Sequence, residues 1–345
     1  MTIRDHIQHI DNATRRWLQV ENRFLREAID KTVQEGLFSF EDIKFAILAL
    51  KEKVDAGQII KWAERVGLGE NQNQKGKKVL CLHAGNLPLV GFQDALGIIL
   101  SGANYSGKLS KKDSYLLPTL LDALKDIVLE NSIHYSTSLD AFDGFQAHKV
   151  LFAGSKQSVQ PVKDQLIQSN AANENTEFVV RTAKFSMAYI TNEEPQVMTD
   201  LVEAVFRYGG QGCRSVAVVV SPTSFKELIC PLQDYIEAFW LKNPQHKQPN
   251  PALEYQFAYN KAIARDQAWL EYFLIQESED FPELDFTLHW VKGDEAKLKE
   301  LKERYGTAVQ TVYTAGQNIE GINTEFLSEA QTPNLWWQPD GVAVI

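Results

Sequence analysis

One cysteine lies in a setting that suits a nucleophile. Residues 208–222 read Y-G-G-Q-G-C-R-S-V-A-V-V-V-S-P, with Gly212 before Cys213 and Arg214 after it. A glycine beside a cysteine leaves the sulfur unscreened and lets another molecule approach the backbone, and a neighbouring guanidinium favours the reactive thiolate. The segment also fits a buried structural thiol, because free cysteines are among the most buried residues. Cys213 is therefore a candidate nucleophile whose role depends on the rest of the chain.

Three other turns carry residues that could hold an acyl group or a nucleotide. The G-N-L-P turn at 85–88 offers a glycine, a side-chain amide and a helix start. Asn86 is either an oxyanion-hole donor or a turn asparagine bonded to its own backbone. In the turn at 152–155, Gly154 and Ser155 form either a seat for pyrophosphate or an ordinary helix cap. Lys108 and Lys111, in K-L-S-K-K-D, could meet ribose hydroxyls or a phosphate, or belong to a solvated charge run.

The elements around these residues alternate between strand and helix. Strands are expected at 79–83, 105–109, 149–153, 178–181, 185–190, 216–220 and 308–314, and helices at 90–101, 113–129, 155–167, 194–208 and 225–240. Residues 3–67 should be helical, with Ser39 and Asp42 as a capping pair, and 67–76 should form a polar loop. This alternation predicts an α/β fold with an open parallel sheet, in which ligands bind at the carboxyl ends of the strands.

Composition limits the classes of function. The chain has 345 residues and a formal net charge of -10, and it has no basic block, which argues against a nucleic-acid surface. Its three cysteines are too scattered for a disulfide framework, and no Cys/His cluster suggests zinc, so we predict no metal site. The first residues are charged where a signal peptide needs an apolar run, and no apolar run could span a bilayer. These features predict a cytoplasmic protein whose membrane contact, if any, is peripheral.

Taken in order, the four segments resemble the aldehyde dehydrogenase superfamily. N-L-P at 86–88 resembles its N-F-P turn, residues 102–108 its G-N-x-x-V-x-K element, F-A-G-S at 152–155 its F-T-G-S turn, and G-Q-G-C at 210–213 its G-Q-x-C loop. The chain is more similar still to the bacterial fatty acyl-CoA reductases, relatives of the reductase in bioluminescence operons. That similarity lies at A-G-N-x-P-L-V-G-F (84–92), K-L-S-x-K-D (108–113) and G-C-R-x-V (212–216). The resemblance spans roughly residues 17–342 and is strong from 79 to 220.

The resemblance implies a Rossmann-type cofactor domain and a second α/β catalytic domain. We expect a helical segment at 1–70, the nucleotide-binding domain at 71–205, the catalytic domain at 206–325 and a tail at 326–345. The implied reaction is reduction of a long-chain acyl-CoA, or another acyl thioester, to the fatty aldehyde with NADPH. By the same resemblance Cys213 takes the acyl group, and the Asn86 side chain and the Cys213 N–H form the oxyanion hole. Lys108 reaches the adenosine ribose, and Gly154 and Ser155 sit against the pyrophosphate.

Two positions refine this expectation. Many NAD-preferring aldehyde dehydrogenases carry a glutamate three residues after the ribose-binding lysine, and this chain has Lys111 there, whose charge would attract the 2′-phosphate of NADPH. Dehydrogenases that release an acid use a glutamate in E-L-G-G-K to activate water, and the matching stretch at 180–187 holds no carboxylate. An acyl-cysteine without that base is better suited to hydride or thiol than to water.

The chain departs from the family pattern in places. Gln93 replaces a usual histidine, Lys111 replaces a serine, and the tail at 338–345 differs. The late E-x-F-G-P element is reduced to Glu325-Phe326. Two alternatives therefore stay open: a cysteine-dependent acyl-transfer protein or thioesterase, and a non-catalytic relative that binds nucleotide or acyl groups. The acyl chain length, a CoA or carrier-protein donor, and homo-oligomerisation are not decided by the sequence.

The remaining reactive or aromatic residues receive structural interpretations. Cys81, in a strand, and Cys230, in a helix, are expected in the core. His83 ends the first strand and could approach the site, although no partner is evident. The Trp336-Trp337 pair either packs a tail onto the body or lines an acyl tunnel, and tail packing is the expectation.

Overall fold

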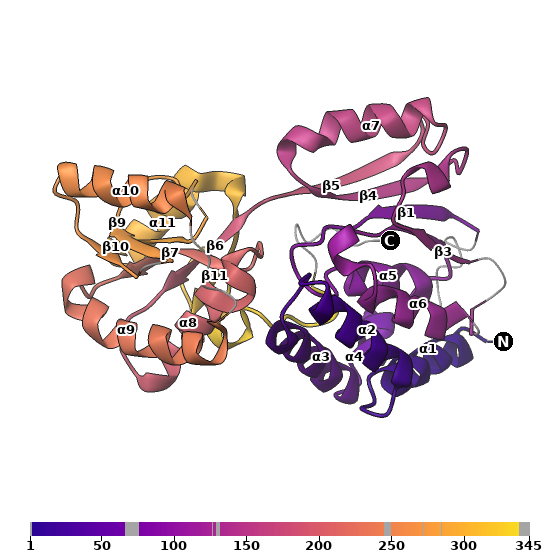
Figure 1. Cartoon of the computed structure of the whole chain (residues 1–345), viewed down its shortest axis with the longest axis horizontal. Helices are drawn as coiled ribbons and strands as arrows, with labels where there is room; N and C mark the ends of the chain where they lie inside the picture. The colour runs from indigo at the N-terminus through magenta and orange to yellow at the C-terminus, as the bar shows by residue number, and fades with distance from the viewer. Residues whose placement is uncertain are drawn as a thin grey trace. The chain divides into compact units, whose positions relative to one another are not determined.

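The computed structural model describes residues 2–65, 76–125, 127–128, 132–244, 250–270, 272–283 and 285–337. The chain divides into two compact units, Met1–Ala183 with Asn334–Ile345, and Lys184–Pro333 (Figure 1). Most of the loop expected at 67–76 falls outside the described residues. No helix within the described ranges is long and apolar enough to cross a bilayer.

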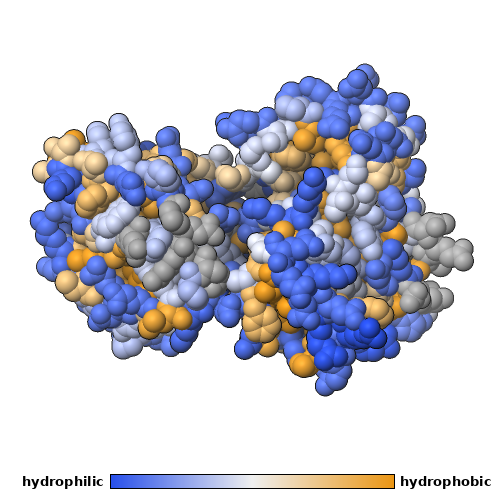
Figure 2. All heavy atoms as spheres, viewed as in Figure 1, coloured by the Kyte–Doolittle hydropathy of each residue, from blue (hydrophilic) through white to orange (hydrophobic). Residues whose placement is uncertain are grey.

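Four helices begin the first unit, as the sequence predicts. They are α1 (Ile3–Trp17), α2 (Arg23–Gln34), α3 (Phe40–Asp55) and α4 (Gln58–Arg65). The Ser39 hydroxyl accepts the N–H of Asp42 and caps α3, which confirms the predicted capping pair. Figure 2 shows mainly hydrophilic residues on the outer surface of this layer, with scattered hydrophobic ones. The inner faces bury large side chains such as Trp17 and Ile43.

A five-stranded sheet forms the centre of the first unit. Its strands are β1 (Lys78–Leu82), β2 (Asn104–Lys108), β3 (Ile133–Ser136), β4 (Lys149–Gly154) and β5 (Glu177–Thr182). They lie in the order β3-β2-β1-β4-β5 and pair in parallel throughout, which confirms the predicted open parallel sheet, although β3 was not predicted. The chain builds β2 and β3 on one side of β1 and then β4 and β5 on the other. The topological switch point therefore lies between β1 and β4.

Alternate residues of β1 face two different cores. Val79 and Cys81 pack with the layer formed by α1 to α4, α5 (Phe92–Leu100) and α6 (Leu116–Lys125). Leu80 and Leu82 pack with the layer on the other face, which includes Leu166 of α7 (Val159–Gln168). Figure 1 shows α7 on one face of the sheet and α5 and α6 on the other. The expectation that Cys81 is a core residue is confirmed, and burial raises the pKa of its thiol.

The second unit contains a seven-stranded sheet, ordered β12-β11-β6-β7-β10-β9-β8. The strands are β6 (Phe185–Tyr189), β7 (Val216–Ser221), β8 (Gln267–Trp269), β9 (Leu274–Glu277), β10 (Thr287–Lys292), β11 (Val309–Thr314) and β12 (Thr324–Phe326). Among the strands in the described part of this unit, only β8 and β9 pair in the antiparallel direction. Of these strands, β6, β7 and β11 were predicted. Of the others, β8 and β12 are only three residues long, and β9 and β10 mix apolar residues with polar ones such as Gln276 and His289, so their pattern was too weak to recognise.

Helices cover both faces of this sheet. The side chains of α8 (Pro195–Phe206) and α9 (Phe225–Lys242) share a core with Ala188 and Val219, whereas those of α11 (Glu295–Tyr305) share one with Met187 and Val218. The prediction that Cys230 lies in the core was wrong, because it is exposed on α9. The buried face of α9 is formed by Phe225, Leu228, Leu232 and Ile236. At 100° per residue, position 230 lies opposite these residues.

The two units divide at residues 183/184, whereas the sequence placed a boundary at 205/206. The reason is strand pairing. Strand β6 hydrogen-bonds to both β7 and β11, so β6 is part of the second sheet, and the α8 helix after it is part of the second unit. The chain also returns to the first unit at Asn334 rather than forming a separate tail from 326.

The returning segment packs into the first unit. The Gln58 side chain donates to Asn334 Oδ1 at 3.1 Å and accepts the Leu335 N–H at 3.0 Å. Gln93 donates to the Asn334 carbonyl at 3.0 Å, which gives a structural role to a position where the family usually has histidine. Leu335 is 1% exposed, and Trp336 packs against the same core. The expected tail packing is thus confirmed for Trp336.

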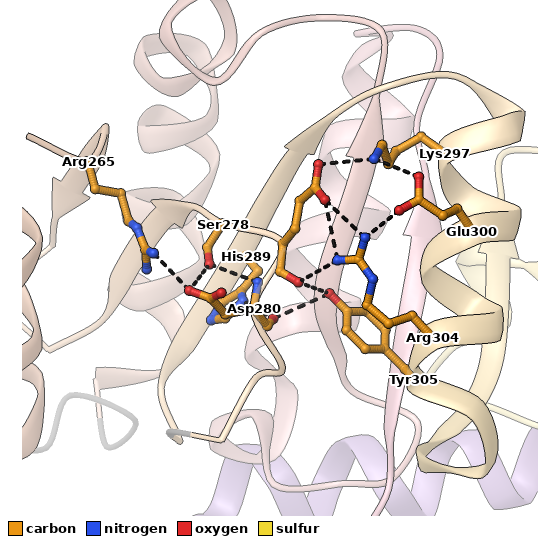
Figure 3. Close-up of polar contacts among 9 residues, drawn as sticks. Arg265, Ser278, Asp280, His289, Lys297, Glu300, Arg304 and Tyr305 are labelled. Carbon is orange, nitrogen blue, oxygen red and sulfur yellow. Dashed lines mark hydrogen bonds and ion pairs between the residues drawn. The ribbon is translucent and has the colours of Figure 1, made fainter. Parts of the chain in front are cut away.

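A buried polar network joins β9, β10 and α10 (Pro251–Ala262) in the second unit. His289 Nδ1 lies 2.9 Å from the Asp280 carbonyl, and His289 Nε2 lies 2.7 Å from Gln276 Nε2. Gln276 Oε1 in turn accepts from Asn260 at 2.6 Å. Figure 3 shows His289 beside Asp280, whose carboxylate also meets Arg265. A neutral imidazole with its proton on Nδ1 fits both contacts, and burial lowers the pKa of His289 to about 4.

This histidine should make the protein less stable in acid. Between pH 6.5 and 4 the unfolded chain binds a proton at His289 that the folded chain does not, so the free energy of unfolding falls as the pH falls. His289→Gln should reduce that fall by up to about 1.4 kcal/mol per pH unit. Urea unfolding of variant and parent from pH 7 to 4.5 measures the difference. His83, whose pKa is lowered, and Asp113, whose pKa is raised, also make stability depend on pH. Both groups are present in the variant and the parent, so the difference between the two stability curves reports His289. Parallel curves would contradict the assignment.

Candidate active site

The turn that carries Asn86 leaves the carboxyl end of β1 and packs directly on the turn after β2. A Cβ atom on Gly85 would lie 1.9 Å from Ser110 Oγ, so only glycine fits there. The His83 N–H donates to the Lys108 carbonyl at 3.0 Å. The predicted need for a glycine at position 85 is therefore met by close approach of the neighbouring turn. Asn86 itself is partly buried.

His83 has a partner that the sequence did not reveal. Its Nε2 lies 2.7 Å from the hydroxyl of Tyr105, the second residue of β2. Cβ atoms on Gly91 and Gly107 would collide with the His83 ring and the Tyr105 hydroxyl, so both glycines make room for this pair. Desolvation lowers the pKa of His83 to about 4. The ring is therefore neutral at pH 7 and supports the turn as a packed, hydrogen-bonded side chain.

Both candidate lysines lie at the end of β2. Lys108 is the last residue of this strand and is partly buried, whereas Lys111 begins the short 3-10 helix η2 (Lys111–Asp113) and is exposed. Asp113, at the end of η2, is buried, and its Oδ2 accepts the Leu89 N–H at 2.9 Å. Burial raises the pKa of Asp113 to about 6, while hydrogen bonds from the amides of Leu89 and Leu117 act in the opposite direction.

The third predicted turn follows β4. A Cβ atom on Gly154 would lie 2.6 Å from the Phe152 ring, so any larger residue at this position would require that ring to move. Ser155 is exposed, and its hydroxyl lies 2.6 Å from that of Ser158 in the 3-10 helix η4 (Lys156–Ser158), which precedes α7. The predicted helix opening is present, with this short helix between the turn and α7.

The sheet order brings five of the six predicted site residues to one edge of one sheet. Asn86, Lys108 with Lys111, and Gly154 with Ser155 follow β1, β2 and β4, and β1 lies between the other two strands. These residues suit a dinucleotide, since they combine amide, hydroxyl and ammonium groups at the carboxyl ends of parallel strands beside a switch point. Within the described residues no three His, Cys, Asp or Glu side chains gather where they could hold a metal ion.

Cys213, the sixth predicted residue, lies in the second unit, in the loop before β7. After α8 the chain turns through Tyr208, Gly209 and Gly210, whose φ angles are 57°, 68° and 73°. The left-handed region is costly for residues with a Cβ atom, which explains the two glycines but makes Tyr208 a strained position. Ser186 Oγ donates to the Cys213 carbonyl at 3.0 Å. The thiol is partly exposed rather than buried in the core.

Arg214 ties the cysteine loop to a distant segment. Its buried guanidinium donates to the Ala330 carbonyl at 2.6 Å and to Glu325 Oε2 at 2.7 Å, and it lies 5.4 Å from the centroid of the Tyr313 ring. From the sequence, Arg214 was expected only to favour the neighbouring thiolate. In the structure its guanidinium pairs with the Glu325 carboxylate. Glu325 had been noted only as a remnant of E-x-F-G-P. Sequence separation of 111 residues concealed this contact.

Known proteins match this chain in structure. No protein-family model matches the sequence, and no curated protein matches it either. Solved structures do match, and three of them serve as examples. Aldehyde dehydrogenase 21 from Physcomitrella patens, in complex with succinate, is 14% identical with a TM-score of 0.61, covering 91% of this chain and 73% of that one. Lactaldehyde dehydrogenase from Escherichia coli is 13% identical with a TM-score of 0.59, covering 92% and 74%. A Mycobacterium tuberculosis aldehyde dehydrogenase, complexed with NAD+, is 11% identical with a TM-score of 0.61, covering 94% and 77%.

The chain has an aldehyde dehydrogenase-like fold. This confirms the predicted fold class, a Rossmann-type parallel sheet with a second α/β unit. At these identities the likeness concerns the fold alone. The resemblance to fatty acyl-CoA reductases, the role of each site residue and the cytoplasmic location stay predictions.

The Arg214 contacts predict a large difference between two arginines of the second unit. Arg214→Ala removes a buried charged group and its bonds to Glu325 and Ala330, so it should lower the free energy of unfolding by about 3 kcal/mol. Arg304, which pairs with Glu279 and Glu300 at the surface of α11 (Figure 3), is the control. Arg304→Ala should cost at most about 1 kcal/mol. If both variants lost the same free energy of unfolding in urea, the buried Arg214 contacts would not have the stabilising role described.

Proposed function

We propose that this protein is an NADPH-dependent reductase that converts a long-chain acyl-CoA to the fatty aldehyde through an acyl group on Cys213. The observation that carries the proposal is the gathering of three distant turns, at Asn86, Lys108 and Gly154, on neighbouring strands of one parallel sheet. Each turn was selected for its chemistry from sequence alone. The fold in which they occur is shared with enzymes that oxidise or reduce at the aldehyde level, which supports the oxidoreductase class.

The covalent step would belong to Cys213. Its thiolate attacks the carbonyl carbon of the acyl thioester, and the C–S bond to CoA breaks, so that the CoA thiolate leaves and the acyl group remains on the enzyme. Negative charge builds on the carbonyl oxygen during this attack. The Asn86 amide and the Cys213 N–H would stabilise that charge by donating hydrogen bonds. A partly exposed thiol preceded by three glycines in five residues is suited to such an approach.

The first unit would bind the cofactor. Lys108 would donate to ribose hydroxyls, and the turn at Gly154 and Ser155 would accept the pyrophosphate beside the switch point. Lys111, exposed on η2, would meet the 2′-phosphate. When bound, NADPH supplies the hydride for reduction of the acyl carbon.

The stretch from β5 to β6 supports reduction over hydrolysis. Residues 180–187 contain no carboxylate that could activate water. Arg181 in this stretch forms a largely buried ion pair with Asp94 on α5, so its charge is used within the first unit. An acyl-cysteine with no general base nearby in sequence would persist until a hydride or a thiol reaches it. A thioesterase or acyl-transfer protein is the alternative, and it would release CoA without consuming NADPH.

The proposal predicts that Cys213 alone carries the acyl group. Cys213→Ala should abolish labelling by radioactive acyl-CoA and lower acyl-CoA-dependent NADPH oxidation by more than about 10³-fold, because the nucleophile is lost. Cys230→Ala is the matched control, since it removes another exposed thiol outside the candidate site. It should retain both activities. Labelling that survives in Cys213→Ala would disprove the assignment, and labelling of the parent without NADPH oxidation would favour acyl transfer.

The cofactor preference should depend on Lys111. Lys111→Glu places a carboxylate where the 2′-phosphate is expected, so the ratio of kcat/KM for NADPH to that for NADH should fall by about 10- to 100-fold. Lys112→Glu makes the same change of charge one residue along and tests for a general field effect. A much larger effect at position 111 is the expected result. An unchanged ratio in Lys111→Glu would refute the role.

A further inference from the structure

Asp113 holds a strained point in the turn that carries Asn86. Leu89 has a φ of 59°, in the left-handed region, and is 4% exposed. A leucine in this conformation is strained, and such conformations persist only where the surroundings hold them. The Leu89 N–H donates to Asp113 Oδ2 at 2.9 Å, and the Leu89 carbonyl accepts the N–H of Phe92, the first residue of α5. The path from Asn86 into α5 is therefore fixed through Leu89.

The other end of the turn is held by the same segment of chain. Gly85 packs against Ser110, and the His83 N–H donates to the Lys108 carbonyl. Residues 108–113 thus contact the turn on both sides of Asn86: Ser110 packs against Gly85 before it, and Asp113 binds the Leu89 amide after it. Of these contacts, only the one to Asp113 depends on a side-chain acceptor 24 residues away in sequence.

The acceptor at this contact is a buried carboxylate, which also receives a hydrogen bond from the Leu117 amide. Asp113 is 4% exposed, and its Oδ1 is buried without a hydrogen-bond partner among the described residues. Burying a carboxylate is unfavourable unless its hydrogen bonds compensate. A charged acceptor makes a stronger bond to an N–H than a neutral one does, which suits a strained residue that must not relax.

We propose that Asp113 is a positioning residue, which fixes the direction of the Asn86 amide by holding Leu89 in its left-handed conformation. This inference rests on the proposed function, in which Asn86 stabilises the oxyanion. Without the carboxylate the Leu89 N–H loses its acceptor, and the turn relaxes toward an ordinary backbone conformation. A donor displaced by about 1 Å can lose about a hundredfold in rate.

Kinetics and hydrogen exchange on three variants test this role. Asp113→Ala should lower kcat by about 100-fold with KM for acyl-CoA changed less than about threefold, after correction for active sites counted by acyl labelling. Asp113→Asn keeps an acceptor of the same shape and should stay within about tenfold of the parent. Asp122→Ala, on the exposed part of α6, is the control and should behave like the parent. Equal kcat values for Asp113→Ala and the parent would overturn the proposal.

A double variant separates positioning from general destabilisation. Asn86→Ala with Asp113→Ala should have the same kcat as Asn86→Ala alone, because Asp113 acts through Asn86. Additive losses would mean that Asp113 supports the fold in some other way and would overturn the positioning role.

Hydrogen exchange tests the structural step without any activity. The amides of a peptide covering residues 84–92 should exchange at least tenfold faster in Asp113→Ala than in the parent, and at nearly the parent rate in Asp113→Asn. Unchanged exchange in Asp113→Ala would overturn the proposal even in an active enzyme. A parent that does not oxidise NADPH with any acyl-CoA would overturn the proposed function, and the exchange rates would still show whether Asp113 holds the turn.

Discussion

The pairing of β1 with two parallel neighbours is the constraint on which the first unit depends. Because β2 and β4 both run parallel to β1, the three turns that follow these strands emerge at the same edge. Because β1 also alternates its side chains between two cores, it cannot shift by one residue without exchanging Val79 and Cys81 for Leu80 and Leu82. The register of one buried strand thus sets where Asn86, Lys108 and Gly154 stand relative to one another.

Each candidate catalytic loop is secured by one buried charged side chain. In the first unit Asp113 accepts the Leu89 amide, and in the second unit Arg214 joins the Cys213 loop to Glu325 and Ala330. Both loops also contain a non-glycine residue in the left-handed region, Leu89 or Tyr208. Strained backbone persists only where the surrounding structure holds it, and it is found mainly at functional sites.

Much of the first unit followed from sequence, because β1, β4 and β5 contain apolar runs bounded by turn residues. The glycines at 85 and 154 were singled out from the sequence, and in the structure Cβ atoms there would lie 1.9 Å from Ser110 Oγ and 2.6 Å from the Phe152 ring. Strands β9 and β10 were missed because polar residues interrupt their apolar ones, and two of these, Gln276 and His289, contact each other across the sheet at 2.7 Å. Such pairing is invisible to periodicity, which recognises apolar faces.

Contacts between distant segments also leave no periodic pattern in the sequence, and this explains why the partners of Asp113 and Arg214 were not predicted. Asp113 appeared within a motif but had no assigned partner, since its contact with Leu89 depends on how two turns pack after the sheet has formed. Arg214 was valued for its neighbour in sequence, yet its partners lie more than a hundred residues away. Residue type and spacing were enough to propose candidate site residues, whereas contacts that depend on packing between turns could not be predicted.

The return of the chain at Asn334 has a consequence for the order in which the protein is made. The core of the first unit includes Leu335, and Gln58 and Gln93 both bond to Asn334, so this unit is incomplete until residues 334–336 have been synthesised. The second unit is a single continuous segment, Lys184–Pro333, and all its strands are available before that point. During translation the second unit can therefore finish folding first, because the core of the first unit is complete only after Leu335 has been synthesised.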